Sequence, residues 1–153
     1  MPNLSRVSLL KTAALALALA STCIATAHAQ RVAVLQFAIV PVGVNDEVLP
    51  SGREIHDLTG DLRTAIGKRK GVTMVASQKA CLDVSCALRI GRSERADVVV
   101  YGQVTRYMAL LWSMQLASVN VRTGQARGLQ QPYKGDVSAL EYDMGNLAGQ
   151  LRL

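Results

Sequence analysis

The sequence predicts an α/β (α+β) domain in which helices pack on a mixed β-sheet of about five strands. Three observations lead to this prediction. Stretches rich in β-branched residues alternate with stretches whose apolar residues recur at helical spacing. The helix-capping pattern Ser-x-x-Glu occurs at Ser51 and again at Ser138. The resulting order of elements is β-α-β-α-β-β-β-α, in which right-handed crossovers join the first three strands and the last three form a meander.

The first 29 residues are predicted to be a secretory signal peptide. Arg6 and Lys11 precede an apolar stretch over about residues 12–24. Residues 27–29, Ala-His-Ala, then provide the small side chains that a signal peptidase recognises. We therefore expect cleavage between Ala29 and Gln30, which leaves residues 30–153 as one domain. This domain carries 15 basic and 11 acidic residues, a mild net charge of +4.

Two alternatives to cleavage are disfavoured. A retained membrane anchor is disfavoured because the apolar stretch is shorter than the ~20 residues of a spanning helix. Lipidation of Cys23 is disfavoured because the residues before it, Ala-Ser-Thr, depart from a lipoprotein signal. We expect no membrane span once the signal is removed.

The first half of the domain is predicted to form a strand, a loop, a helix and a second strand. A strand over residues 31–37 would carry apolar side chains on both of its faces, as a buried central strand does. Residues 38–50 contain two prolines and are expected to form a long exposed loop. The helix should then run from Ser51 to about Lys68, and residues 72–76 should form the next strand.

Cys81 and Cys86 are the only cysteines outside the signal peptide, and in an exported chain they predict a disulfide. Two residues five apart within one helix lie too far apart for this bond. Both cysteines can be bridged if Asp83 is the N-cap of a helix that runs to about Gly91 or Ser93, because Cys81 then lies outside the helix. Cys81 would then fold back from the incoming loop onto the first helical turn. The small ring should contribute about 2 kcal/mol.

The second half is predicted to form three strands and a closing helix. In the strand over residues 98–106, Gly102 permits a close approach of another group. In the strand over residues 110–122, apolar residues move from even to odd positions, which predicts a β-bulge near residues 116–118. After a turn at Thr123-Gly124, residues 125–131 should form a polar edge strand that Pro132 ends. Four apolar residues then mark an amphipathic helix: Leu140, Met144, Leu147 and Leu151.

No catalytic, cofactor or metal site is predicted. His56 is the only histidine after the signal, and its neighbour Asp57 would not face it on a helix. Asp57 and Asp61 read as solvated acids, because calcium requires more oxygen ligands than they supply. Trp112 falls on the same alternate positions as Leu110 and Met114, which predicts that it packs in the core and is not a binding residue. The basic triplet over residues 68–70 fits a helix C-terminus better than a nucleic-acid site, since no aromatic residue interleaves with it.

Several stretches together carry a family resemblance: "RVAVLQF", "LTGDLRTAI", "CLDVSCALRIGRSERADVVVYGQVTR" and "NVRTGQ". In this order they resemble bacterial envelope domains that include the N-terminal domain of TolB and the periplasmic domain of CsgG-type proteins. The end, "KGDVSALEYDMGNLAGQL", is similar to small predicted-secreted bacterial proteins of unknown function. The resemblance implies an α/β fold with a mixed sheet, no shared catalytic residue, and a role in binding other envelope components.

The expected function is therefore that of a periplasmic or secreted, non-enzymatic module that binds an envelope protein or a small ligand, and not nucleic acid. The loop over residues 38–50 or an edge strand would provide the binding surface. The alternative is a periplasmic thiol–disulfide oxidoreductase that uses Cys81 and Cys86. The Cys-x4-Cys spacing differs from the Cys-x-x-Cys typical of such enzymes.

Overall fold

The fold is described from a computed structural model, which covers residues 28–41, 52–108, 111–134 and 138–153. Within these residues six strands and three helices follow one another along the chain. In order they are β1 (Gln30–Val34), β2 (Ala38–Pro41), α1 (Gly52–Gly67), β3 (Val72–Val75), α2 (Val84–Glu94), β4 (Val98–Met108), β5 (Leu111–Asn120), β6 (Ala126–Lys134) and α3 (Ser138–Gln150).

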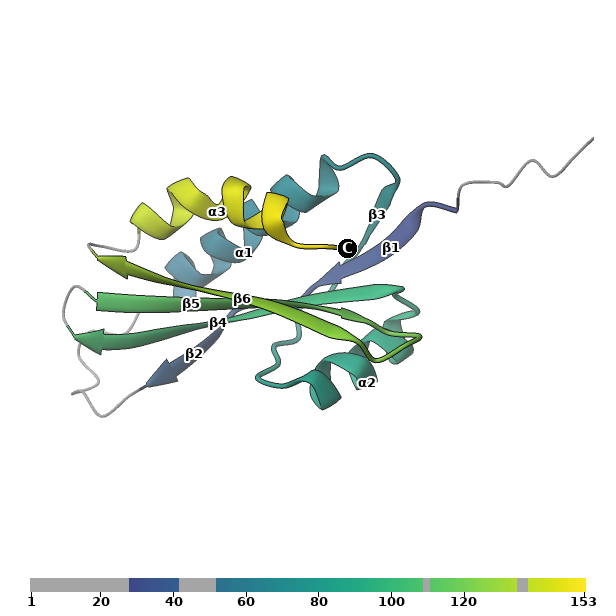
Figure 1. The fold of residues 1–153 in the computed structure, drawn as a ribbon, viewed down its shortest axis with the longest axis horizontal. Coiled ribbons are helices and arrows are strands. Elements are labelled where there is room, and N and C mark those ends of the chain that lie inside the picture. Colours follow the sequence, from purple (N-terminus) through teal and green to yellow (C-terminus); the bar gives the residue numbers. More distant parts are fainter. Residues whose placement is uncertain (1–27, 42–51, 109–110, 135–137) are drawn as a thin grey trace, which may run out of the picture.

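The strands form one mixed sheet, which confirms the predicted fold class. Their order across the sheet is β3-β1-β4-β5-β6, and β2 pairs with β4 beyond the end of β1. The pairs β1–β3, β1–β4 and β2–β4 are parallel, whereas β4–β5 and β5–β6 are antiparallel. The parallel strands are connected through helices, and β4 to β6 form the predicted meander (Figure 1).

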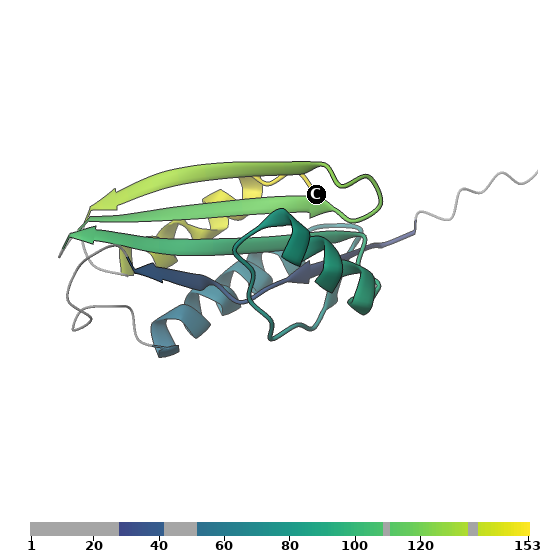
Figure 2. The same cartoon turned by 90° about the horizontal axis from the view of Figure 1, so that it is seen from below.

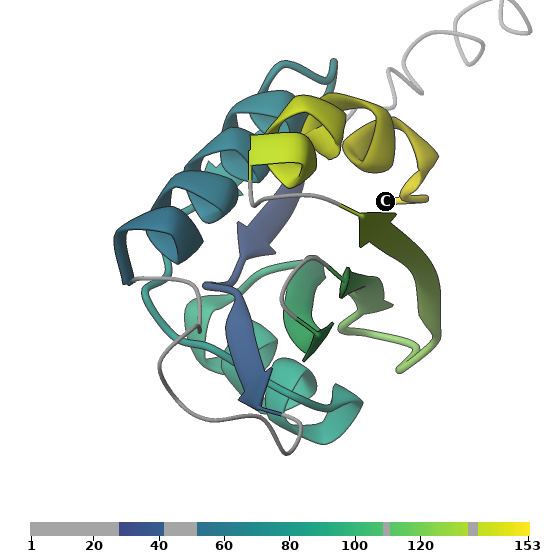
Figure 3. The ribbon, with the colours of Figure 1, turned by 90° about the vertical axis from the view of Figure 1, so that its left-hand side faces the viewer.

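Helices α1 and α3 lie on one face of the sheet, and α2 lies on the opposite face (Figures 2 and 3). We call the side that α1 and α3 cover the two-helix face, and the opposite side the α2 face. The core under α1 and α3 includes Val34, Val100, Met114 and Leu116, each at most 1 % exposed. A smaller core under α2 joins Leu35, Val99 and Val119 to Ala87 and Ile90. Apolar burial on both faces is the main stabilising term of the fold.

The predicted bulge near residues 116–118 is wrong. The pairing of β4 with β5 runs without interruption from Val98–Asn120 to Arg106–Trp112, and the register shifts only between Arg106 and Met108. The change of pattern in β5 has another cause. Even positions such as Met114 face α1 and α3 at one end, and odd positions such as Val119 face α2 at the other. The strand is thus buried on both faces, at different ends.

Two element boundaries also differ from the predictions, and the sheet has six strands instead of about five. Residues 38–41 are not loop but strand β2, and β1 ends at Val34, with an isolated bridge from Gln36 to Ala80 between the two. Pro132 does not end β6, which continues to Lys134. Proline is tolerated there because β6 is an edge strand, whose outer N–H groups have no ladder partner.

Other predictions agree with the structure or fall outside it. Asp83 caps α2, its carboxylate accepting a hydrogen bond from the Cys86 N–H at 2.8 Å. Gly102 permits the expected close approach, because a Cβ there would lie 2.7 Å from Cδ1 of Phe37. The rest of the predicted loop, residues 42–50, and both Ser-x-x-Glu caps lie outside the described residues or side chains.

Candidate binding surface

Helix α2 covers only one end of its face of the sheet, and none of the described elements covers the other end (Figure 2). The strand register brings three glutamines into one row across this uncovered part: Gln103 of β4 pairs with Gln115 of β5, which pairs with Gln130 of β6. Each is partly or fully exposed. We call this uncovered part of β4, β5 and β6, together with Leu82, the open surface. A row perpendicular to the strands arises because paired residues share a face.

The open surface contains a shallow hollow of about 340 Å³. Its lining has no charged residue: Leu82, Tyr101, Gln103, Gln115, Leu116, Ala117, Gly128, Leu129 and Gln130. Leu82 is one of these lining residues, and its side chain is 59 % exposed. A neutral wall of amides and apolar groups suits an uncharged polar partner better than an anion or a cation.

Hydrogen bonds hold the amides of the open surface in place. The Gln103 Nε2 donates to Gln115 Oε1, and Gln130 Nε2 donates to Ser113 Oγ at 3.1 Å. Burial and the nearby Asp83 carboxylate raise the pKa of Tyr101, which keeps its hydroxyl protonated. The surface therefore presents ordered donors and acceptors, and little side-chain entropy would be lost when a partner binds.

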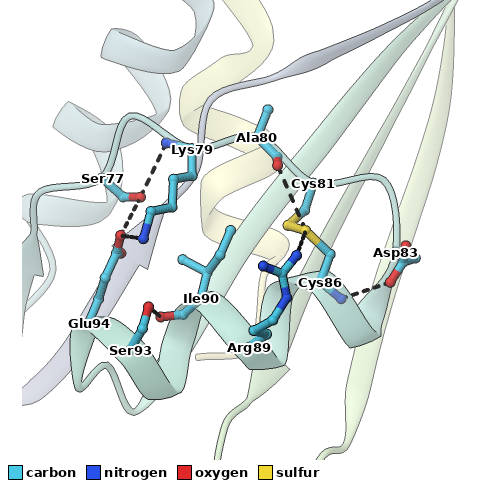
Figure 4. The surroundings of a disulfide bond; sticks show 10 residues. All are labelled: Ser77, Lys79, Ala80, Cys81, Asp83, Cys86, Arg89, Ile90, Ser93 and Glu94. Atoms are coloured by element: carbon cyan, nitrogen blue, oxygen red, sulfur yellow. Dashed lines mark hydrogen bonds and ion pairs between the residues drawn. A yellow bond between two sulfur atoms is a disulfide. The ribbon is translucent and has the colours of Figure 1, made fainter.

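Leu82 is one of the residues in the ring that the Cys81–Cys86 disulfide closes. Figure 4 shows the disulfide and the residues around it. The two sulfurs are 1.98 Å apart and the two Cα atoms 5.7 Å apart. Cys81 is buried in the loop before α2, whereas Cys86 is half-buried in the first turn of the helix. The Arg89 Nη2 lies 3.9 Å from the Cys86 sulfur. The loop-to-helix arrangement is the one that the spacing of the cysteines required.

A polar network fixes the segment that leads to this ring. Glu94 of α2 forms an ion pair with Lys79 at 3.2 Å and accepts a hydrogen bond from Ser77 Oγ at 3.0 Å. Arg63 of α1 donates to the backbone oxygens of Val34 and Ser77. Burial lowers the pKa of Arg63. Because its partners are carbonyl dipoles and not carboxylates, this guanidinium acts as a connector between β1 and the segment before α2.

The other residues singled out from the sequence do not form a site. His56, Asp57 and Asp61 are exposed on α1, and Trp112 is in the core with the Arg106 guanidinium 4.8 Å from its ring centre. No group of three or more metal-ligating side chains occurs in the part of the chain that the structure describes. No described helix is long and apolar enough to cross a membrane.

The basic triplet follows the end of α1, as predicted. Its central residue, Arg69, connects α1 to α3, because it donates to the backbone oxygens of Ala148 at 3.2 Å and Leu151 at 2.9 Å, at the end of α3. Cations at this position complement the partial negative charge of a helix C-terminus.

The fold is similar to two solved bacterial proteins. The C-terminal domain of LpoB from Salmonella enterica matches with a TM-score of 0.53 and 17 % identity, over 70 % of this chain and 84 % of the other. PelC from Paraburkholderia phytofirmans, solved as a dodecamer, matches with a TM-score of 0.53 and 13 % identity, over 78 % of this chain and 86 % of the other. No family model and no curated protein sequence matches. At these identities the likeness shows the fold alone.

Proposed function

We propose that this protein is an exported, non-enzymatic binding module of the bacterial envelope and that the open surface holds its partner. The observation that carries the proposal is the row of three glutamines beside Leu82, on a part of the sheet that no described element covers. The solvated face of an antiparallel sheet usually carries polar side chains. In the hollow of this surface, amides lie together with the apolar residues Leu82, Ala117 and Leu129, and no charged residue lines it.

Three further observations support the proposal. The N-terminal 29 residues have the pattern of a secretory signal, and a disulfide is typical of exported proteins. The only histidine of the domain is exposed on α1 and does not line the hollow of the open surface. The two similar structures, the LpoB domain and PelC, show that this fold occurs in bacterial proteins.

Site-specific photo-crosslinking in living cells tests the proposal. A photoreactive phenylalanine at Gln115 lies in the middle of the open surface, and the same residue at His56 lies on the exposed side of α1. We expect ultraviolet light to produce a discrete crosslinked species from position 115 and none from position 56. Mass spectrometry of the species identifies the partner. A chain that crosslinks at neither position, or equally at both, would contradict the proposal.

A second candidate function, thiol–disulfide exchange, is favoured by one observation. Cys86 lies in the first turn of α2 and the Arg89 guanidinium is 3.9 Å from its sulfur, and both features stabilise a thiolate. The reduction potential distinguishes the two functions. A structural disulfide should have a potential below about −300 mV, whereas a catalytic one would be higher. A labile bond together with insulin reductase activity would support the enzyme.

A further inference from the structure

The basic side chains are concentrated at one end of the molecule. Strands β1, β3 and β4 are parallel and begin at the same end, and all three helices finish at that end, where the β5–β6 hairpin also turns (Figure 1). We call this end the basic pole. It carries nine of the 15 basic residues of the domain: Arg31, Lys68, Arg69, Lys70, Arg92, Arg95, Arg122, Arg127 and Arg152.

Hydrogen bonds between the elements show that these residues share one end of the molecule. The backbone N–H of Arg31 donates to Asp97 Oδ2 at 2.8 Å, and Val121, which precedes Arg122, donates to the Asp97 carbonyl at 2.9 Å. Gln30 donates to the carbonyl of Gly71, next to Lys70, at 2.7 Å. The starts of β1, β3 and β4 and the end of β5 therefore meet there.

Few carboxylates offset this charge. Among the described residues of the basic pole, Glu94 already forms an ion pair with Lys79, and Asp97 accepts a hydrogen bond from the backbone of Arg31. Eight of the nine basic residues are exposed, Arg69 being half-buried. The opposite half carries a more balanced set: Glu54, Asp57, Asp83 and Asp143 with Arg53, Arg106 and Lys134.

Helix dipoles explain only part of the basic pole. Arg69 and Arg92 lie at helix C-termini, where cations are favourable. Arg31 and Arg127 begin strands and Arg122 lies in a hairpin, so they complement no helix end. Arg95 adopts a left-handed backbone conformation with φ of 55°, which a glycine or asparagine would adopt more readily. An arginine there suggests a use for its side chain.

We propose that the basic pole docks on an anionic phospholipid surface. The chain enters the fold at Gln30, in the basic pole, shortly after the apolar stretch over residues 12–24. A signal segment of that composition enters the membrane during export, which holds the start of the domain, and with it the basic pole, near the lipid until cleavage. The arginines are distributed around several elements and not gathered in one cleft, which matches a flat array of phosphates.

One hollow at the basic pole can receive a single headgroup. It has a volume of about 310 Å³ and combines Arg127 and Arg152 with the amides of Asn120 and Gln125. Arginine binds phosphate through two parallel N–H donors, and amide N–H groups can supply further donors. The expected mode is peripheral: arginines contact the phosphates and no described helix enters the hydrocarbon.

Vesicle co-sedimentation tests this inference. The protein is purified in the form that the cell makes, with its N-terminus read by mass spectrometry. It is then mixed with vesicles of phosphatidylglycerol and phosphatidylethanolamine, or of phosphatidylcholine alone. We expect binding to the anionic vesicles that weakens as salt is raised, and little binding to phosphatidylcholine. The double variant Arg95→Asn/Arg122→Gln should bind about 25-fold more weakly, since each arginine near the surface contributes about fivefold.

The matched control is Arg53→Gln/Lys134→Gln, which removes the same charge from two exposed residues of the opposite half. It should bind anionic vesicles as the unaltered protein does. Asparagine is suited to the backbone of Arg95, so the first variant should fold, which its thermal unfolding checks. Equal binding to both vesicle types, equal losses in both variants, or binding to soluble dextran sulfate but not to vesicles would overturn the inference.

Discussion

The two faces of the sheet use the same strands in different ways. On the two-helix face, Met114 and Leu116 are sealed under α1 and α3. On the α2 face, the intervening Gln115 lies beyond the reach of α2 and remains partly exposed beside Leu82. The two-helix face therefore supplies the larger buried core, whereas the part of the α2 face that no described element covers leaves polar side chains accessible, as the proposed function requires.

The largest difference in the free energy of unfolding should be found between alanine variants of two neighbouring residues of β5, one on each face. Met114→Ala removes a fully buried side chain and should lower the free energy of unfolding by about 2–5 kcal/mol. Gln115→Ala, one position along, should change it by less than about 0.5 kcal/mol. Urea unfolding followed by Trp112 fluorescence measures both. Similar losses in the two variants would show that the faces are equally important for stability.

Two glycines sharpen the same comparison. A Cβ at Gly102 would lie 2.7 Å from Phe37 Cδ1 and 2.8 Å from Leu116 Cδ2, on the two-helix face. Gly102→Ala should therefore cost about 1–3 kcal/mol through overpacking. At Gly128, on the open surface, the nearest atom would be the Leu116 carbonyl oxygen at 3.5 Å. Gly128→Ala should be tolerated, and a variant as unstable as Gly102→Ala would contradict the assignment of the two faces.

The α2 face depends on the disulfide more than the two-helix face does. Cys81→Ser/Cys86→Ser should lower the free energy of unfolding by about 2 kcal/mol, because the unfolded chain gains the freedom of a small opened ring. Hydrogen exchange should rise in the segment before α2 and stay unchanged in α1. Dithiothreitol should reproduce the loss in the unaltered protein and have no effect on the variant. If the variant is as stable as the unaltered protein, the bond contributes nothing to the fold.

The effect expected to be smallest at neutral pH concerns Tyr133, in the core of the two-helix face, because it emerges only at alkaline pH. Burial and the neighbouring Asp143 raise its pKa to about 12, whereas a tyrosine in the unfolded chain ionises near pH 10. Between these values the unfolded chain has lost a proton that the folded protein retains. Stability is therefore complete below about pH 10 and falls as the pH rises toward 12.

Tyr133→Phe should make this fall shallower, as measured by urea unfolding at several pH values. Tyr142→Phe is the matched control, because Tyr142 is 88 % exposed and should not couple to folding. An unchanged slope in Tyr133→Phe, or the same change in both variants, would contradict the assignment of the slope to Tyr133.

Most of the fold could be predicted because local patterns specify it. The cap at Asp83 and the run of valines at the start of β4 each involve only a few neighbouring residues. Strand β2 escapes prediction because its four residues end in a proline and precede a segment rich in turn formers. The wrong prediction of a bulge also comes from a local pattern. In a strand that is buried on one face at one end and on the other face at the other end, apolar residues move from even to odd positions without a bulge.

The open surface could not be predicted in the same way. Gln103, Gln115 and Gln130 are distant in sequence, and only the register of β4, β5 and β6 aligns them. Their exposure depends on where α2 begins relative to the strands, because the helix runs from there toward the other end of the sheet. The polar composition of β6 is a weak signal, because it is equally typical of an edge strand. The basic pole likewise emerges only when the parallel strands bring separate arginines together.

Footprinting in intact cells tests most directly whether the open surface is a binding site. A carbene reagent labels exposed side chains in the purified protein and in living cells, and mass spectrometry compares the two patterns. We predict that labelling of residues 111–117 and 126–132 decreases in cells, while labelling of residues 53–61 on α1 stays the same. Equal labelling of both regions in cells and in solution would show that nothing covers the open surface and would contradict the proposed function.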